Sequence, residues 1–321
     1  MKRKFSAILT AVISSALLFG SASSAYAAET TSVGSLKGPT SMGIVQFMSE
    51  QEASEAPDFD FTMVTAADEL VASFTKGDTD IALLPANVAS VLYNKTKGNV
   101  QVLDINTLGV LYLVTADTSI TGVADLKGKT LYSTGKGQTP EYALNYLLDA
   151  NGLSADDVTV EYKSEPTEVV SILAQDETAV GVLPQPFATV ACQQNDKLQL
   201  AADLTAEWDK TNNGTMVTGV TIAKKDFVEA NPEIIDKFLT SHSASTDYVN
   251  TNTTEAAKLV ASYGIVEKAP IAEKALPKCN ITCMEGEEMK EALSGYLNVL
   301  FEQNPESVGG ALPEDDFYYS K

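Results

Sequence analysis

Two periodicities alternate along the chain. Short runs rich in β-branched and aromatic residues predict buried strands, and the segments between them carry apolar residues every three or four positions, as amphipathic helices do. The first series comprises expected strands at 32–36, 61–65 and 81–84 and expected helices at 41–52, 68–76 and 87–95. The second series comprises strands at 130–134, 158–162 and 179–183 and helices at 140–151, 168–175 and 186–195. This alternation predicts an α/β protein with parallel-rich sheets that are covered by helices on both faces.

The two series repeat each other at a constant spacing of 99 residues. A four-residue sequence, KGPT at 37–40, returns as KGQT at 136–139, and the segment 68–89 aligns with 167–188 without a gap. Six of those 22 aligned positions are identical, including a Leu-Pro pair at the end of the third strand of each series. We therefore expect two structurally equivalent Rossmann-like lobes rather than one barrel.

Two extended runs are the expected connections between the lobes. The run at 105–117 leaves the first series and enters the second, and the run at 214–227 follows the second. We interpret these runs as two hinge crossings. Lobe I then comprises residues 28–109 and 221–321, and lobe II comprises residues 110–220. The helical remainder of the chain then packs on lobe I. A separate C-terminal helical domain is the alternative.

The first 27 residues read as a secretory signal peptide. Lys2, Arg3 and Lys4 form a basic start, an apolar stretch follows, and Ala25-Tyr26-Ala27 provides small residues for cleavage. A retained membrane anchor is the alternative, but the apolar run is short for a membrane span. No cysteine lies near the cleavage point. We therefore expect export to the periplasm or the cell surface without a lipid anchor.

The charge of the chain excludes some partners and limits its chemistry. Removal of the three basic residues of the signal leaves 19 basic and 43 acidic residues, a net charge of −24. Such a charge repels phosphate backbones, so we expect no nucleic acid partner. The only arginine lies in the signal, and His242 is the only histidine. A His-based metal site or a Ser-His-Asp triad would have to rest on that one residue, which we expect on a helix surface. We therefore predict no catalytic residue, no metal and no cofactor.

The three cysteines, Cys192, Cys279 and Cys283, leave two interpretations open. In an exported protein, Cys279 and Cys283 are candidates for a disulfide or for half of a metal site. Their segment reads as extended, however, and residues four apart on a strand lie roughly 13 Å from each other, too far for a disulfide. Reduced, structural cysteines are the favoured interpretation.

Two turns in each lobe are the expected ligand-binding loops. In open α/β sheets, ligands bind beyond the carboxyl ends of the strands, at the N-termini of helices. One such turn is K-G-x-T, where the glycine permits close backbone approach and the following Thr or Ser is suited to cap the helix. The other is the turn after each Leu-Pro pair. Two facing lobes would direct all four loops at one cleft.

Two single residues keep two interpretations each. Lys136 is either a cation that contacts the ligand or a solvated side chain. Trp208 is either a lid over the ligand or a packing residue.

Several segments resemble the substrate-binding proteins of ABC importers. They are ADLKGKTLYSTGKGQTPEYALNYLL from 124, DTDIALLPANVA from 78, YKSEPTEVVSILA with AVGVLPQPFA, and KKDFVEANPEIIDKFL. The resemblance is to the type II periplasmic-binding-protein fold, in particular the nitrate/sulfonate/taurine and thiamine-pyrimidine-precursor group. It implies a monomer whose two lobes close on a small ligand and deliver it to the permease subunits of an ABC importer in the membrane.

The resemblance also implies which residues face the ligand. Carried onto this chain, the cleft residues are Gly38, Pro39, Thr40, Ser41, Asn87, Asn106, Thr107, Lys136, Gly137, Gln138, Thr139 and Gln185. The chain departs from the group in two respects. It has no arginine after the signal, and it lacks the cofactor-bearing histidine and cysteine-rich stretch of the pyrimidine-precursor enzymes. A zwitterionic or heteroaromatic ligand therefore fits better than a free sulfonate.

Three functions remain open from the sequence. The leading hypothesis is a solute-binding protein without catalysis. The second is an enzyme on the same fold that acts on a small heterocycle or organic acid, with Glu141 or Glu165 as its acid or base. The third is a sensory module that presents its ligand-bound form to a receptor.

Overall fold

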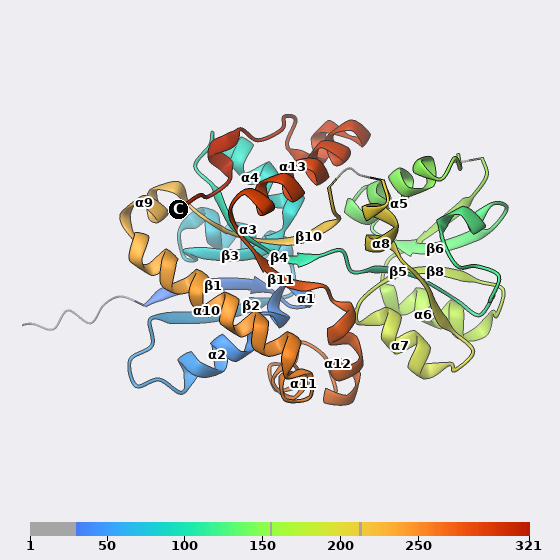
Figure 1. Ribbon diagram of the computed structural model, residues 1–321, viewed down its shortest axis with the longest axis horizontal. Coiled ribbons are helices and arrows are strands. Elements are labelled where there is room, and N and C mark those ends of the chain that lie inside the picture. The colour runs from blue at the N-terminus through green and yellow to red at the C-terminus, as the bar shows by residue number, and fades with distance from the viewer. Residues whose placement is uncertain (1–29, 155, 212–213) are drawn as a thin grey trace, which may run out of the picture.

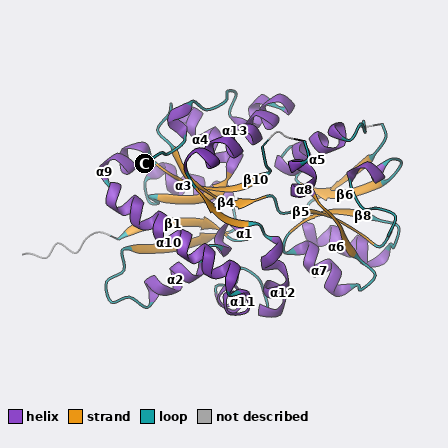
Figure 2. Ribbon diagram, in the orientation of Figure 1, coloured by secondary structure: helices purple, strands orange, loops and turns teal. Residues whose placement is uncertain are grey.

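The computed structural model describes residues 30–154, 156–211 and 214–321, so the predicted signal peptide lies outside the described residues. Two sheets lie side by side, each flanked by helices (Figures 1 and 2). The strands of the six-stranded sheet are, in spatial order, β11 (Ile281–Met284), β4 (Gln101–Leu108), β10 (Val217–Ala223), β3 (Ile81–Pro85), β1 (Thr31–Leu36) and β2 (Phe59–Val64). Those of the five-stranded sheet are β7 (Thr159–Lys163), β6 (Thr130–Thr134), β8 (Val180–Pro184), β5 (Leu111–Thr115) and β9 (Gln199–Asp203). The predicted α/β class is confirmed.

The two sheets share one pairing scheme. In the first, β1 is parallel to β2 and β3, and β10 runs antiparallel to β3. In the second, β6 is parallel to β7 and β8, and β5 runs antiparallel to β8. In each sheet the antiparallel neighbour is a strand from one of the two extended runs that the sequence marks as crossings. The sequence repeat at a spacing of 99 residues therefore corresponds to equivalent strands in equivalent positions of the two sheets.

Helices cover both faces of each sheet. The first series contributes α1 (Pro39–Met42), α2 (Val45–Glu52), α3 (Ala67–Lys76) and α4 (Ala86–Lys95). The second contributes α5 (Thr139–Ala150), α6 (Pro166–Gln175), α7 (Phe187–Gln194) and α8 (Leu204–Asp209), with a 3₁₀ turn, η1 (Val123–Leu126), before β6. The C-terminal part contributes α9 (Lys225–Ala230), α10 (Pro232–Thr251), α11 (Thr253–Ser262), α12 (Ala269–Ala275) and α13 (Gly286–Gln303), and the 3₁₀ turns η2 (Leu276–Lys278), η3 (Pro305–Val308) and η4 (Asp315–Phe317). The sequence analysis did not anticipate β9 or α8.

The helix predicted over 41–52 is divided into α1 and α2. A side chain from α10 explains the break. The Ser245 hydroxyl donates a hydrogen bond of 2.7 Å to the carbonyl of Gly43 and accepts one of 3.1 Å from the backbone N–H of Phe47. These bonds satisfy backbone groups that a continuous helix would pair internally. The break therefore depends on a residue about 200 positions away.

The C-terminal helices pack on the earlier elements. Phe238 of α10 joins Phe47 and Phe59, with ring centroids 5.8 Å from both, and so covers one face of the six-stranded sheet. Tyr296 of α13 packs against Trp208 of α8, with centroids 5.4 Å apart. Helix α13 therefore contacts an element that follows the five-stranded sheet as well as the helices of the six-stranded one (Figure 1).

The limits of the lobes remain a prediction. The first crossing corresponds to β4 and β5, which follow each other in the chain but lie in different sheets. Strand β10 lies in the six-stranded sheet over its whole length, so we propose that the second crossing ends where β10 begins, at Val217. Among the described residues, no helix has the length and apolar character needed to cross a membrane.

Candidate ligand-binding site

A pocket of about 470 Å³ lies at the carboxyl ends of three parallel strands that come from both sheets. Pro85 ends β3, Thr134 ends β6 and Pro184 ends β8, and all three residues line the pocket. This is the position at which open α/β sheets bind ligands, because helix N-termini and loops meet there. Both proline residues belong to the repeated Leu-Pro pairs. The pocket is therefore built from equivalent points of the two series.

Uncharged side chains form the wall of the pocket. Its polar groups are hydroxyls and carboxamides, which belong to Asn87, Ser133, Thr134, Gln138, Thr139, Tyr142, Thr218, Tyr296 and Ser307. Its apolar part consists of Ala67, Pro85, Val88, Val110, Leu111, Pro140, Val182, Pro184 and Met216, and Gly137 completes the lining. Among the described residues that line it, none is acidic, basic or a histidine. An apolar body with a few hydrogen-bonding groups is typical of small-molecule sites.

The KGQT turn is held in place by the first turn of α5. Gly137 has a φ of +74°, which favours glycine, and its N–H donates to the Glu141 carboxylate. The Tyr142 hydroxyl donates to the Gly137 carbonyl at 3.1 Å and accepts from the Asn304 amide at 2.9 Å. Since the Gly137 N–H already has a partner, the polar side chains that this turn contributes to the lining are those of Gln138 and Thr139. Lys136 is exposed and does not line the pocket.

The equivalent KGPT turn lies outside this pocket. Thr40 is 7% exposed and Ser41 fully buried, and both hydroxyls donate to the carbonyl of Leu36. Pro39 begins α1, and Gly38 precedes it with a φ of +147°. Capping by Thr or Ser was expected for both turns and is wrong for both. Gly38 and Gln138 occupy the N-cap positions without a side-chain cap, and the threonines lie inside the helices.

The other predicted residues are divided between the pocket and the interior. Asn87 lines the pocket, and its amide nitrogen donates to the carbonyl of Ser307 at 3.2 Å. Asn106 and Thr107 are buried, and the Thr107 hydroxyl donates to the Asn106 carboxamide at 2.9 Å. Gln185 is also buried, and its side-chain oxygen accepts from the Thr189 hydroxyl at 2.8 Å. None of these three lines this pocket, and the Gln185 side-chain nitrogen is buried without a hydrogen-bond partner among the described residues.

Sequence reasoning missed an aromatic wall of the pocket. Tyr296 is fully buried, and burial raises the pKa of its hydroxyl, which therefore stays protonated and able to donate. Its hydroxyl lies beside Thr139 and lacks a hydrogen-bond partner of good geometry among the described residues. Trp208, fully buried, packs behind Tyr296 and is not a lid. No local signal distinguishes Tyr296 from the other apolar positions of its helix.

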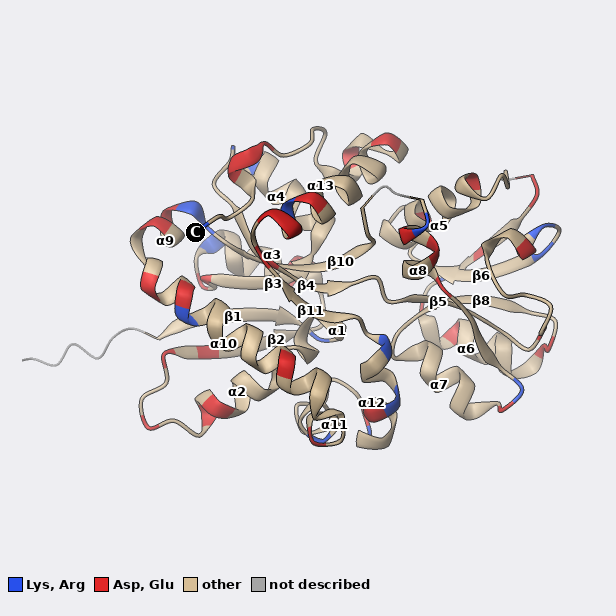
Figure 3. Cartoon of the chain, in the orientation of Figure 1, with Lys and Arg blue, Asp and Glu red and all other residues tan. Residues whose placement is uncertain are grey.

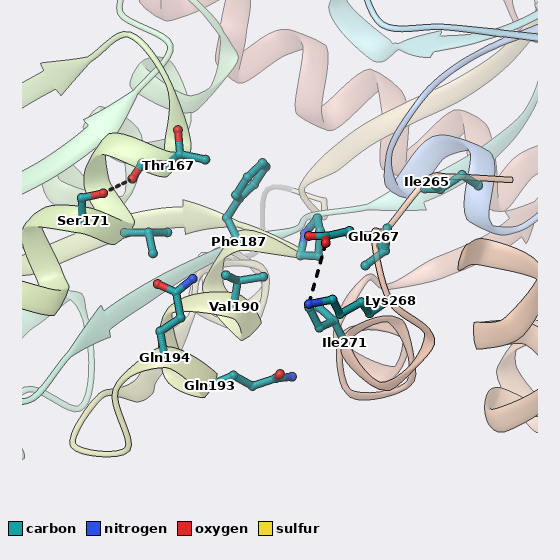
Figure 4. A pocket seen from close by; sticks show the side chains of 13 residues that line it. Thr167, Ser171, Phe187, Val190, Gln193, Gln194, Ile265, Glu267, Lys268 and Ile271 are labelled. Carbon is teal, nitrogen blue, oxygen red and sulfur yellow. Dashed lines mark hydrogen bonds and ion pairs between the residues drawn. The ribbon is translucent and has the colours of Figure 1, made fainter. Parts of the chain in front are cut away.

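A second hollow, of about 600 Å³, lies between α6 and α7 on one side and the segment around α12 on the other (Figure 4). Phe187 projects from the start of α7, and Ile265, Glu267 and Lys268 lie across from it. This hollow is larger than the first. Most of its lining comes from the sides of helices, however, and only Pro186 and Phe187 directly follow a strand end. We therefore place the candidate site in the 470 Å³ pocket.

A known protein family and a curated relative match this chain. Residues 96–256 match the family described as NMT1/THI5 like. The chain belongs to this family. The matched region includes the whole five-stranded sheet and both crossings. A candidate binding protein of Brucella abortus, BAB2_1146, is 26% identical over 220 residues, which are 66% of this chain and 67% of the relative.

Solved structures share the fold of this NMT1/THI5-like protein. An ABC transporter structure from Parabacteroides distasonis has a TM-score of 0.78 at 23% identity and covers 91% of this chain and 99% of its own. The periplasmic aliphatic sulphonate binding protein SsuA from Escherichia coli has a TM-score of 0.71 at 16% identity, with coverage of 91% and 92%. A desulfurization enzyme, DSZB, also matches, with a TM-score of 0.61 at 13% identity and coverage of 86% and 92%. The predicted resemblance is confirmed for the family and for the two-lobed fold.

The predicted position of His242 in this NMT1/THI5-like chain is also wrong. His242 was expected on a helix surface, but its side chain is fully buried, and its Nδ1 lies 3.1 Å from the Asp104 carboxylate. The spacing of His242 from apolar residues in the sequence already indicates that its side chain is buried. His242 lies four residues after Phe238 and seven after Ile235, on the face of α10 that packs inward.

Proposed function

We propose that this protein is an extracytoplasmic solute-binding protein of an ABC importer. In this proposal it traps a small ligand between its two lobes and delivers it to permease subunits in the membrane. The observation that carries the proposal is the pocket at the carboxyl ends of β3, β6 and β8, to which the equivalent Leu-Pro strand ends of both series contribute Pro85 and Pro184. Membership of the NMT1/THI5-like family and the shared fold support it. The signal peptide and a monomeric state belong to the same proposal.

The ligand that fits this pocket is a small uncharged molecule with an apolar, preferably heteroaromatic, body. Hydroxyl and carboxamide groups can pair with its polar atoms, and proline, valine and methionine side chains can cover its faces. A free sulfonate or nitrate would bury its charge without a cationic partner, which is costly. Acidic residues are spread over both lobes and add to the repulsion of anions (Figure 3). We therefore do not propose a sulphonate ligand for this chain, although the Escherichia coli protein is named for one.

Binding without catalysis is part of the proposal. Among the described residues that line the pocket, none is an Asp, Glu, His, Lys or Cys, the side chains that most often act as general acids or bases. Glu141, the candidate acid or base, accepts a hydrogen bond from the Gly137 N–H and supports the turn. Turnover of a bound heterocycle would contradict this part of the proposal.

A thermal-shift measurement on the mature protein, from Ala28 onward, tests the binding role and the ligand class together. The panel contains uncharged pyrimidines and related heterocycles, amino acids, sulfonates and nitrate. A ligand at about 1,000 times its Kd stabilises the protein by roughly 4 kcal/mol, which is a shift of several degrees. We expect the shift with uncharged heterocycles. A shift with sulfonates alone would contradict the ligand class but keep the binding role.

Native mass spectrometry complements the panel, because it detects a ligand that co-purifies with the protein. Absence of any shift and of any co-purified molecule would contradict the binding role itself. Stimulation of the permease-linked ATPase by the loaded protein distinguishes transport from sensing. A sensory module would bind the same ligand and leave that ATPase unchanged.

A further inference from the structure

Three potential metal ligands meet in lobe I, away from the pocket. Asp104 of β4, His242 of α10 and Cys283 of β11 each offer one ligand atom, and these atoms all lie within 4.8 Å of one another. Asp104 and His242 are fully buried, and Cys283 is partly buried. Carboxylate oxygen, imidazole nitrogen and thiolate sulfur are all ligands that Zn²⁺ accepts. We propose that these three residues form a binding site for a zinc-like divalent transition-metal ion.

A neighbouring hydroxyl orients the Asp104 carboxylate. The Asp104 carboxylate accepts a hydrogen bond of 2.8 Å from the Thr221 hydroxyl through Oδ1, while its Oδ2 lies 3.1 Å from His242 Nδ1. The Asn106 amide donates in turn to the Thr221 hydroxyl at 3.3 Å. Outer partners of this kind fix the orientation of metal ligands and tune their affinity. The Asp104 carboxylate is therefore preorganised towards His242.

The second nitrogen of His242 supports the same interpretation. His242 Nε2 is buried and has no hydrogen-bond partner in the described chain, and the same holds for the Thr246 hydroxyl one helical turn later. Both atoms lie close to the point where a Cβ on Gly43 would be, at 3.6 and 3.2 Å. An ion on Nδ1 places the ring proton on Nε2, so that nitrogen is then a donor rather than an acceptor. Occupation of Nδ1 therefore fixes the tautomer of the imidazole.

The charges of the site also match a divalent cation. One carboxylate and one thiolate balance an M²⁺ ion, and a neutral imidazole adds no charge. A neutral set is favourable in the interior, because burial of an uncompensated carboxylate is costly. A third protein ligand leaves the fourth tetrahedral position for water.

Cys283 lies on the strand of the site that is held least by its neighbours. Ligand atoms around one zinc ion lie roughly 3–4 Å apart, given bond lengths of about 2.0–2.3 Å. Strand β11 is at the edge of its sheet and pairs with β4 only at Ile281–Thr107 and Met284–Ile105, with an irregularity between them. Cys283 lies within this irregular part. Because β11 is the edge strand, no further strand of the sheet pairs with it on the side away from β4. A bound ion would tie β11 to β4 and α10.

Metal titration of the tag-free mature protein tests the proposal. A histidine tag must be absent, since His242 is otherwise the only histidine. After treatment with a chelator, Zn²⁺ is titrated by calorimetry and Co²⁺ by absorbance. We expect one tightly bound ion per chain and a Co²⁺–thiolate charge-transfer band in the near ultraviolet. Absence of stoichiometric binding or of the band would overturn the proposal.

Two cysteine variants separate the site from weak binding by surface carboxylates. Cys283→Ser should remove the thiolate band and lower zinc affinity at least 100-fold, with urea unfolding of the metal-free protein as the check on folding. Cys192→Ser is the matched control, because Cys192 lies on α7, away from the cluster, and should leave both readouts unchanged. Equal zinc affinity in Cys283→Ser and the wild type would overturn the proposal. Neither readout depends on the ligand of the pocket.

Discussion

The two K-G-x-T turns share a sequence but differ in their surroundings. Thr40 of the first is buried beside β10, whereas Thr139 of the second is only partly buried and lines the pocket. The difference comes from the crossing strand. A Cβ on Gly219 of β10 would lie 2.4 Å from the Thr40 methyl group, so the strand passes directly against the first turn. Equivalent turns thus have different roles, because the connections between the lobes differ in position.

The largest effect is expected from a bulky residue in the first turn. Thr40→Trp should lower the free energy of unfolding by about 3 kcal/mol, because the indole has no space between α1 and Gly219. Urea denaturation measures the change. An unfolding midpoint equal to that of the wild type would show that the first turn is not packed as described.

The same substitution in the second turn should affect binding instead. Thr139→Trp fills part of the pocket and should weaken binding of the ligand found by thermal shift at least 100-fold. The expected change in unfolding free energy is under about 1 kcal/mol, because the site is partly exposed. Calorimetry and urea denaturation provide the two measurements. Thr139→Ser, which keeps the hydroxyl, is the control, and unchanged affinity in Thr139→Trp would remove this turn from the site.

A smaller effect on binding is expected from the aromatic wall. Tyr296→Phe removes a buried hydroxyl that lies beside Thr139 and should weaken binding roughly 3- to 10-fold, the equivalent of one neutral hydrogen bond. Stability should stay the same or rise slightly, since an unpaired polar group is lost. The same calorimetric titration measures the effect. Identical affinities would mean that the ligand does not contact this hydroxyl.

The smallest effect concerns a contact between α4 and the C-terminal segment of the chain. The Tyr93 hydroxyl donates to Asp316 at 2.6 Å, and burial together with this carboxylate raises the pKa of Tyr93 to about 12. An unfolded tyrosine has a pKa of about 10, so the folded state holds the proton more tightly. The contribution to stability is therefore present below pH 10 and is lost as the pH rises from 10 to 12.

Tyr93→Phe should make the alkaline loss of stability shallower. Urea midpoints at pH 8, 10 and 11.5 measure the slope for the variant and the wild type. The slope should not vanish, because the pKa of Tyr263 is also raised to about 12, by burial and by Glu52. An identical slope in both proteins would contradict the assigned role of Tyr93.

Much of the fold could be predicted because its signals are local. Strands such as 81–84 and 130–134 and the helix at 68–76 lie within a residue or so of their predicted limits, since apolar spacing and Gly or Pro boundaries are read from neighbouring residues. The break between α1 and α2 was not predictable in this way. It depends on Ser245, which only the folded chain brings to Gly43.

The candidate site was predictable only in part. The positions of Asn87, Gly137, Gln138 and Thr139 follow from the general geometry of strand ends in α/β sheets, and all four line the pocket. Tyr296 and Thr218 reach the same pocket from the C-terminal helix and the returning strand. Their contribution depends on long-range packing, for which the sequence has no spacing rule.

By itself, the sequence determined the α/β class, the two equivalent series and the absence of a guanidinium group after Arg3. Each of these is fixed by composition or by periodicity within a short window. Only the tertiary structure decided that one K-G-x-T turn is buried and the other open, and that Asp104, His242 and Cys283 meet. The physical reason is that these outcomes depend on contacts between residues far apart in the chain. Such contacts form when the crossings bring separate elements together, and no local pattern encodes them.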